Sequence, residues 1–244
     1  MDEELEEIIA AAHDALDDER PADARAMLEP AIARPGARDE VRAEALGLAA
    51  VAARAEGQER DARALSDRAI ALASSSPELL ADLLEDRAEL ELAARAPGSA
   101  ASLLERAIAL RASSGAETWL ALGEARLRAG ALDGADDALA HAEQGARDEE
   151  DDEGVALAIE MRADVALARP DAAAAGATYA RAIDAWRALE DDAAIVRCLV
   201  GRARAAELDD DAGAVAAILR ELEAIDGDVE GRAEAVDEVR ALMP

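Results

Sequence analysis

The feature that most constrains the fold of this sequence is a set of small residues that recurs at fixed offsets along nearly the whole chain. If Gly123 is taken as position 8 of a repeat, positions 8 and 20 are small in six successive copies. Small residues at two such positions let paired helices approach backbone to backbone, so the pattern predicts stacked helix pairs. Position 8 is occupied by Ala12, Ala50, Ala88, Gly123, Ala163 and Gly201, and position 20 by Ala24, Ala62, Ala100, Ala135, Ala175 and Gly213.

Two further columns follow the same frame and break together in the last copy. Position 27 is Ala in five copies and Arg220 in the sixth. Position 4 reads Ile8, Leu46, Leu84, Trp119 and Ile159, and then Arg197. The sixth copy is therefore either a terminal, partly exposed repeat or a place where the register slips.

The segment 116–149 carries the most complete version of the pattern. Trp119, Leu122 and Gly123 open it, and Ala135, Leu139 and Ala142 follow at fixed offsets. This arrangement resembles the tetratricopeptide repeat (TPR), although Arg126 stands where that family usually has Tyr and Leu139 where it has Phe. The resemblance implies an all-α fold, a right-handed superhelix or α-solenoid of about six antiparallel helix pairs with a C-terminal capping helix.

The repeat frame covers nearly all of the chain, so a single TPR-like helical repeat domain is expected over residues 1–244. The position-8 residues lie 38, 38, 35, 40 and 38 residues apart, which places extra residues in the connections. Pro, Gly and Asp occur where the turns between helices are expected. The predicted repeats span about 3–36, 39–75, 77–113, 115–148, 152–190 and 191–226, and the predicted capping helix spans 228–243.

The composition suits close helix packing. Hydrophobic residues make up 52% of the chain but aromatic residues only 1%, and alanine is the best helix former. Trp119 occupies a core column and is expected to be buried. Trp186 is expected to pack under the next pair, with a partly exposed binding anchor as the alternative.

The charge balance excludes several partners. Fifty-six acidic residues face 26 basic ones, all of them Arg, for a net charge of −30. A nucleic-acid binder needs a basic surface, and an anionic membrane would repel this chain. Neither a secretory signal nor a long apolar span is evident, and Cys198 is the only cysteine, so a cytoplasmic location is expected. Both a GC-rich genome and adaptation to high salt would explain the acidity.

The resemblance also indicates a binding surface, because the concave face of TPR proteins is lined mainly by positions 2, 5, 9 and 12 of the first helices. Those positions are acidic with an apolar seam here, so we expect a protein-interaction scaffold that binds a basic or amphipathic segment. One alternative is that the acids are ordinary solvated carboxylates, and another is a self-associating structural protein. The predicted partner-binding residues are Glu44, Val51, Glu85, Glu89, Leu120, Glu124, Glu160 and Asp164.

The sequence offers little for catalysis. His13 and His141 are the only histidines, and neither metal-ligand spacing nor a phosphate-binding glycine loop occurs. We therefore expect no enzyme activity, no cofactor and no metal, and we expect Cys198 to be a packing thiol. TPR domains that bind acidic C-terminal tails use Lys and Asn, and this chain contains neither.

Overall fold

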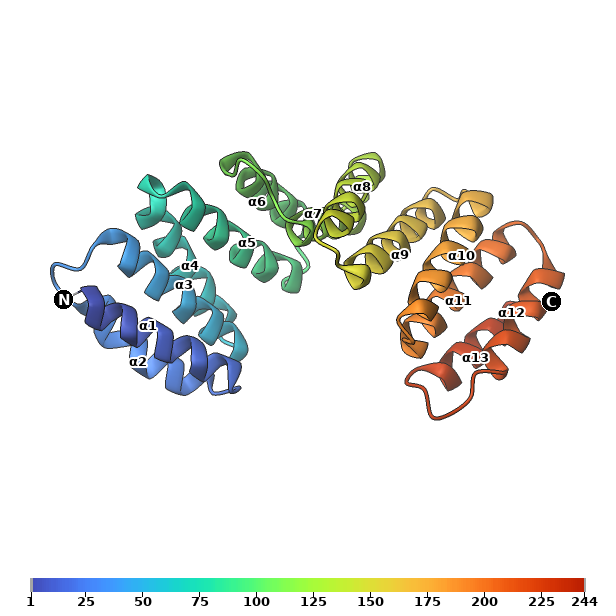
Figure 1. The fold of residues 1–244 in the computed structure, drawn as a ribbon, viewed down its shortest axis with the longest axis horizontal. Coiled ribbons are helices and arrows are strands. Elements are labelled where there is room, and N and C mark those ends of the chain that lie inside the picture. Colours follow the sequence, from blue (N-terminus) through green and yellow to red (C-terminus); the bar gives the residue numbers. More distant parts are fainter. Residues whose placement is uncertain (1, 244) are drawn as a thin grey trace. The chain divides into compact units, whose positions relative to one another are not determined.

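The computed structural model describes residues 2–243, which form thirteen α-helices and one short 3₁₀ helix, with no β-strand among them. The chain divides into two compact units, one ending at Ser114 and the other beginning at Gly115. No helix in the described part of the chain is long and apolar enough to cross a membrane. Figure 1 labels the helices: α1 (Asp2–Asp17), α2 (Pro21–Ala33), α3 (Asp39–Ala55), α4 (Glu59–Leu72), η1 (Ala73–Ser75), α5 (Pro77–Ala93), α6 (Pro97–Leu110), α7 (Ala116–Arg128), α8 (Leu132–Asp148), α9 (Asp152–Ala168), α10 (Ala172–Ala188), α11 (Asp192–Leu208), α12 (Ala212–Glu223) and α13 (Arg232–Ala241).

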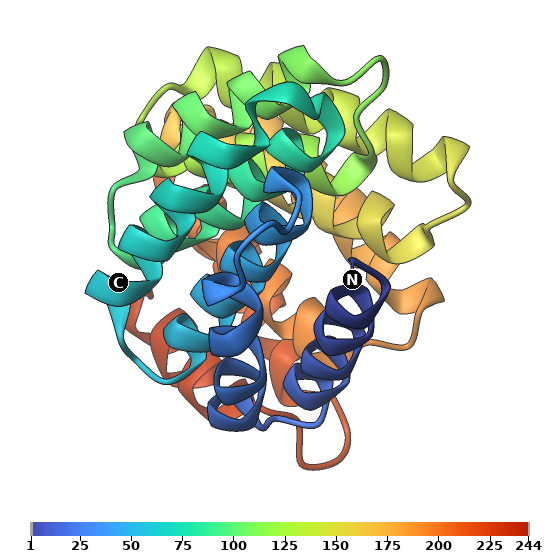
Figure 2. The same ribbon diagram turned by 90° about the vertical axis from the view of Figure 1, so that its left-hand side faces the viewer.

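The helices pair in the order that the repeat predicts, so the all-α repeat fold is confirmed. In unit 1, helices α1 to α6 form three successive pairs, and α1 lies beside α2 in antiparallel fashion (Figure 2). In unit 2, helices α7 to α12 form three more pairs. Each predicted repeat range contains one pair. That the whole chain forms a single domain stays a prediction.

The small columns are buried where paired helices meet. The position-8 alanines are all at most 3% exposed, and the alanines at position 20 are fully buried. A methyl group added to Gly123 would lie 2.5 Å from Leu139 of the paired helix, so the glycine permits this approach. In the first five repeats the position-20 amide donates to the carbonyl of the N-cap residue, which directly precedes the second helix, and this bond marks the register.

The sixth repeat is shifted by two residues relative to the predicted register. There the amide that donates to the carbonyl of Asp211 belongs to Val215, which is buried, and Gly213 is exposed. Position 4 correspondingly falls on buried Leu199 rather than on Arg197, and position 8 on Ala203. Side chains predicted to line the concave face in the unshifted frame, Ile195, Cys198 and Ala205, are consequently buried. The apparent departure of this repeat is a slip of register.

Position 4 is buried only where a helix pair of the same unit precedes it. Leu46, Leu84, Ile159 and Leu199 are at most 7% exposed. Ile8 and Trp119, on the first helix of unit 1 and of unit 2, are only partly buried. The expectation of a buried core position for Trp119 is therefore wrong; its ring stacks on His141 of α8 with the centroids 4.5 Å apart.

One turn geometry follows the first helix of every pair. The amide two residues beyond the C-cap donates to a carbonyl five residues earlier, as from Arg20 to Ala15, and the same bond follows the second helices α8, from Asp151 to Ala146, and α10. The intervening residue has a positive φ, supplied without steric cost by Gly57 and Gly130 but by Glu190 at 58° elsewhere. Helices α9 to α12 each follow an Asp N-cap, and the four caps accept from backbone amides at 2.8 to 3.0 Å: Asp151, Asp171, Asp191 and Asp211.

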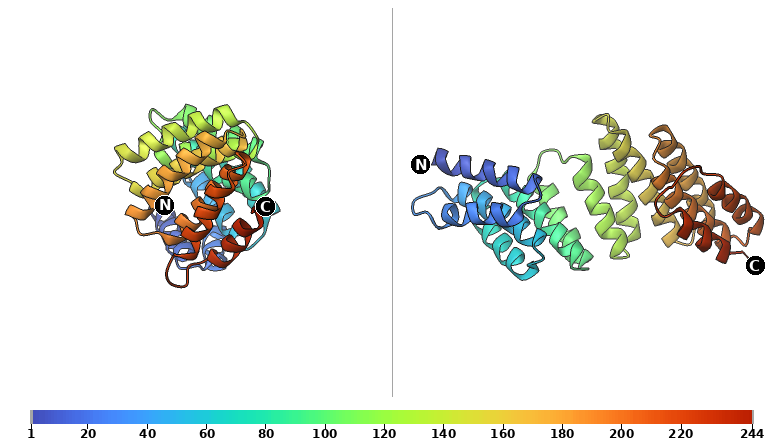
Figure 3. Two further views of the ribbon diagram at one scale, coloured as in Figure 1. Left: turned by 90° about the vertical axis from the view of Figure 1, so that its right-hand side faces the viewer. Right: turned by 90° about the horizontal axis from the view of Figure 1, so that it is seen from below.

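Helix α13 covers the last pair, as the predicted capping helix does. It contacts α11 and α12, and Val239 is fully buried in the unit 2 core. Figure 3 shows α13 beside α12 at the C-terminal end of that unit. The helix begins at Arg232 rather than near 228, because Gly231 before it has a φ of 75°.

Candidate partner-binding pockets

Unit 1 contains an open pocket of about 410 Å³ between α1, α3 and α5. Six of its lining residues occupy the concave positions that the repeat predicts, among them the predicted partner-binding residues Glu44 and Val51. Sequence positions far apart in the chain thus meet on one surface. The lining residues are His13, Leu16, Asp17, Glu44, Gly47, Leu48, Val51, Leu79, Asp82, Leu83 and Asp86.

The walls of this pocket are apolar and its charges are acidic. Leu48 and Leu83 are buried in the wall, and none of the residues that line the pocket is Arg. Glu44 is exposed at the rim, and no hydrogen bond or ion pair joins it to another described residue. Gly47 lets α3 approach α5 closely, because a methyl group there would lie 2.4 Å from Leu83 Cδ2.

Asp86 lines this pocket, although it is not at one of the repeat positions that were predicted to form the concave face. It is half-buried and makes no hydrogen bond or ion pair within the described chain. Burial raises the pKa of Asp86 to about 6, with repulsion from Glu89 adding to the effect and Arg54 opposing it. A partly desolvated carboxylate without a partner is costly to keep, which marks the position as a candidate binding residue.

A smaller cavity of about 10 Å³ adjoins the open pocket and shares Gly47, Val51, Leu83 and Asp86 with it. Ser66 of α4 also lines this inner cavity, and its hydroxyl is buried without any hydrogen-bond partner. Arg54 lines it too, but its guanidinium is bound at 2.6 Å by Glu89, one of the predicted partner-binding residues. The Arg54–Glu89 pair leaves the Asp86 carboxylate free.

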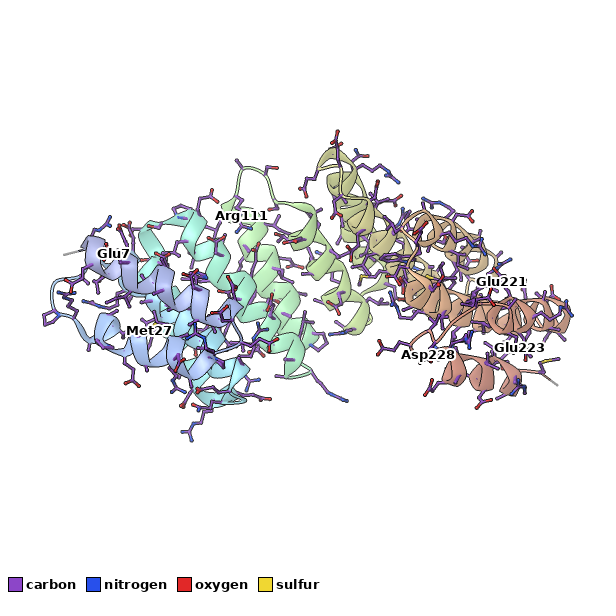
Figure 4. All side chains as sticks on the ribbon, turned by 60° about the horizontal axis from the view of Figure 1, so that its bottom comes forward. Glu7, Met27, Arg111, Glu221, Glu223 and Asp228 are labelled. Atoms are coloured by element: carbon purple, nitrogen blue, oxygen red, sulfur yellow. The ribbon has the colours of Figure 1, made fainter. Side chains whose placement is uncertain are left out.

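Glu85, another predicted partner-binding residue, does not line this pocket. Its carboxylate pairs with Arg111, which also pairs with Asp82 and lies 3.6 Å from Glu78. Arg111 follows the last residue of α6 (Figure 4) and links that end of the helix to α5. Glu85 therefore has a partner inside unit 1.

Unit 2 contains a second open pocket of about 280 Å³ between α7, α8 and α9. The predicted concave residues Glu117, Leu120 and Leu157 line it, together with Asp151 and Glu153. Leu120 is thus the predicted partner-binding residue that lines a pocket in this unit. Glu124, one turn further along α7, pairs instead with Arg128 at 2.6 Å.

Glu160 and Asp164 on α9 are engaged by side chains of their own unit. Glu160 accepts a hydrogen bond from Trp186 Nε1 at 2.8 Å and pairs with Arg197 at 3.2 Å. Asp164 accepts from the Tyr179 hydroxyl at 2.5 Å; burial raises the pKa of Asp164, and this hydrogen bond opposes the rise. Trp186 is only 3% exposed, which confirms packing rather than a surface anchor.

The single thiol lies in the same region. Cys198 is fully buried, and burial raises its pKa far above the ordinary value. A buried thiol with a raised pKa is a poor nucleophile, so its expected packing role is confirmed. Within residues 2–243 no group of three or more His, Cys, Asp and Glu side chains could hold a metal ion.

Sequence reasoning did not single out Glu143. Its carboxylate on α8 is buried and is bound by Arg162 at 2.6 Å, by Arg181 at 3.0 Å and by Arg147. Burial alone would raise the pKa of Glu143, but the hydrogen bonds from the guanidinium groups outweigh it and lower the pKa below its usual value. The signal available in sequence was the buried stripe of α8, since Glu143 follows Leu139 and Ala142 at helical spacing.

The sequence matches no protein-family model. No curated protein matches it either. Solved structures match the fold closely at low identity. PilF of Pseudomonas aeruginosa superposes with a TM-score of 0.68 at 17% identity, over 98% of this chain and 98% of that one.

Two other structures are similar over most of their length. Nearly identical TPR-like repeats from Podospora anserina give a TM-score of 0.65 at 16% identity, covering 78% of this chain and 97% of theirs. The assembly chaperone of RpL4, Acl4, gives 0.56 at 17% identity, covering 97% of this chain and 95% of that one. The paired helices, their buried small columns and these likenesses together show that the chain has the tetratricopeptide-repeat fold.

Proposed function

We propose that this protein is a protein-interaction scaffold whose concave side binds a basic or amphipathic segment of a partner. The observation that carries the proposal is the pocket of unit 1, where predicted concave positions from three helices meet around apolar walls and unneutralised carboxylates. Such a surface complements a segment that carries both apolar and cationic side chains. The similarity to Acl4, an assembly chaperone of RpL4, agrees with a role in holding another protein.

The unit 1 pocket suits this role better than the acids of α9. Glu160 and Asp164 already hold Trp186, Arg197 and Tyr179. A partner would have to displace those contacts, whereas Glu44 and Asp86 are available without any rearrangement. We therefore assign the main contribution to unit 1 and a smaller one to the pocket around Leu120 in unit 2.

The test is capture of partners from lysate of the source organism by immobilised wild-type protein and by two charge-reversal variants. Glu44→Arg places a cation at the rim of the pocket. Glu29→Arg makes the same change on an exposed face of α2 that lines no pocket described here. Reversal of Glu85 is unsuitable because it would break the contact with Arg111.

A partner retained by wild type and Glu29→Arg but lost from Glu44→Arg is the expected result. Equal retention by all three forms would show that the unit 1 pocket is not the binding surface. The self-associating alternative is distinguished by sedimentation of the purified protein over a range of concentrations, where it requires a mass that grows with concentration.

A further inference from the structure

The outer pocket and the inner cavity of unit 1 together offer one side chain an apolar wall followed by polar groups. The outer pocket offers Leu16, Val51 and Leu83 as an apolar wall. The inner cavity shares Val51, Leu83 and Asp86 with the outer pocket and adds the Ser66 hydroxyl. Arg54 also lines it, with its guanidinium paired to Glu89. A side chain with a long apolar stem and a compact polar end matches this order of surfaces.

Two polar groups of the inner cavity, the Ser66 hydroxyl and the Asp86 carboxylate, lack partners among the described residues. The Ser66 hydroxyl belongs to a residue that is only 2% exposed, and a buried hydroxyl is normally hydrogen-bonded. Asp86 is an acceptor without an ion pair, in surroundings that already contain Asp82 and Glu89. Both groups are satisfied at once by a donor that is cationic and small.

The size of the inner cavity favours one of the two common cationic side chains, lysine and arginine, over the other. About 10 Å³ is room for one water-sized group. An ammonium group is a compact point charge with three donors, whereas a guanidinium is a wide planar fork. The cavity therefore fits the end of a lysine side chain and excludes that of arginine.

We propose that the unit 1 pocket binds a lysine side chain of the partner segment, with the ammonium group held between Asp86 and Ser66 and the stem packed along Val51 and Leu83. This assignment rests on the proposed function and names the chemistry that the pocket recognises. The net charge of −30 draws cations to the whole surface, but the inner cavity distinguishes lysine from other cations.

Recognition by Asp86 also makes binding depend on pH. The charged and titratable groups around Asp86 come from three helices. Its own helix α5 carries Asp82, Glu85 and Glu89, and Arg111 pairs with Asp82 and Glu85. Helix α3 contributes Glu44 and Arg54, and helix α1 contributes His13 and Asp17. The pKa of Asp86 is about 6, so at pH 5 only about a tenth of this carboxylate is charged. Affinity for lysine is expected to fall about tenfold between pH 7.5 and pH 5.

The experiment titrates Nα-acetyl-lysine methylamide, which keeps the side-chain ammonium group, into the isotope-labelled full chain and follows the backbone amide chemical shifts by NMR. N-acetyl-norleucine methylamide supplies the same stem without the charge, and N-acetyl-arginine methylamide supplies the charge in a wider head group. The expected result is saturable shifts around Gly47, Ser66 and Asp86 with the lysine probe, and affinity at least about tenfold weaker with the other two.

The variants locate the effect. Asp86→Asn and Ser66→Ala are expected to weaken lysine binding by about tenfold or more, and Glu29→Gln, which removes a charge outside the pocket, to leave it unchanged. Asp86→Asn should also abolish the pH dependence, while His13→Gln should retain it. Neither pocket variant is expected to unfold the protein, because each removes an unpartnered buried polar group.

Equal binding of the lysine and arginine probes, shifts spread over the acidic surface, or no saturable binding of the lysine probe would each overturn the assignment. The partner capture above separates this failure from that of the proposed function. A partner lost from Glu44→Arg but retained by Asp86→Asn would preserve the scaffold role and refute lysine recognition. A partner retained by both variants would refute the binding surface itself.

Discussion

Replacing Asp86 by Asn should make the protein more stable at neutral pH, although it removes a charge from the binding pocket. The carboxylate is half-buried and unpaired, and burial raises its pKa from the ordinary 3.8 to about 6. That difference corresponds to about 3 kcal/mol between the two protonation states. The side chain is partly exposed, so solvent screening reduces the expected gain to about 2 kcal/mol in the free energy of unfolding.

The pH dependence follows from the direction of the pKa change. A carboxyl with a raised pKa in the folded state binds more protons when folded than when unfolded between about pH 4 and pH 6. Its favourable contribution is therefore complete below about pH 4 and is lost as the pH rises through about 6. Asparagine resembles the protonated acid, so wild type and Asp86→Asn should be equally stable at pH 4 and differ fully at pH 7.5.

The measurement is urea unfolding of both proteins at a series of pH values, with Glu29→Gln as the matched loss of an exposed carboxylate. The control is expected to change stability by less than about 0.5 kcal/mol at every pH. A variant that is less stable than wild type at pH 7.5, or a difference that does not shrink toward pH 4, would refute the account of Asp86 as an unpaired desolvated acid.

Four other positions and the salt dependence give further predictions. Glu143→Gln should lower the free energy of unfolding by about 3 kcal/mol at pH 7, because it removes the charge that three guanidinium groups share. The lowered pKa of Glu143 makes this contribution complete above the ordinary value of 4.5, so urea titrations should show the difference shrink as the pH falls through the lowered pKa. Glu190→Gly should raise stability by about 1 kcal/mol, because the φ of 58° strains any residue with a side chain, and an unchanged midpoint would contradict this. Gly201→Ala should destabilise unit 2 by about 2 kcal/mol or more, because the added methyl group would lie 2.2 Å from the ring of Tyr179. Gly176→Ala, whose methyl group meets nothing within 4 Å, should instead stabilise its helix by about 1 kcal/mol. Equal shifts of the melting temperature for the two variants would be inconsistent with this packing. The melting temperature of wild type should rise with NaCl, because the acidic side chains that give the net charge of −30 repel one another and about 1 M salt shortens the Debye length to about 3 Å. A flat or falling curve would mean that local ion pairs already offset the repulsion.

The repeat columns predicted most of the fold because they report a local physical requirement. Positions 8 and 20 must be small wherever paired helices touch, and Ala12 and Ala24 meet that need as fully as Ala163 and Ala175 do. The same columns misplaced the sixth repeat, since in a chain so rich in alanine and glycine a frame shifted by two still finds small residues. The Asp caps were the better marker there.

Those caps could have been found in the sequence. Asp151 and Asp191 begin successive first helices, and Asp171 and Asp211 begin the second helices that follow them. An Asp at a helix start has a geometric role, because its side chain must accept from a backbone amide. Small residues tolerate several frames, but a cap permits only one.

The candidate site was only partly predictable. Concave positions identify side chains by their direction, and they placed Glu44, Val51 and Leu120 at pockets. Direction does not tell which acids are already paired, because Glu89 and Glu124 meet Arg residues whose reach depends on the packed structure.

The two most informative acids, Glu143 and Asp86, show how a structure with many carboxylates can indicate function. Glu143 is buried, but Arg147, Arg162 and Arg181 neutralise it, and its pKa is lowered. Asp86 is also withdrawn from water, yet the nearest guanidinium, that of Arg54, is bound to Glu89 instead. A chain that contains 26 Arg could neutralise Asp86 as it neutralises Glu143. The free carboxylate, beside a buried hydroxyl that also lacks a partner, is therefore best explained by a ligand that supplies both contacts.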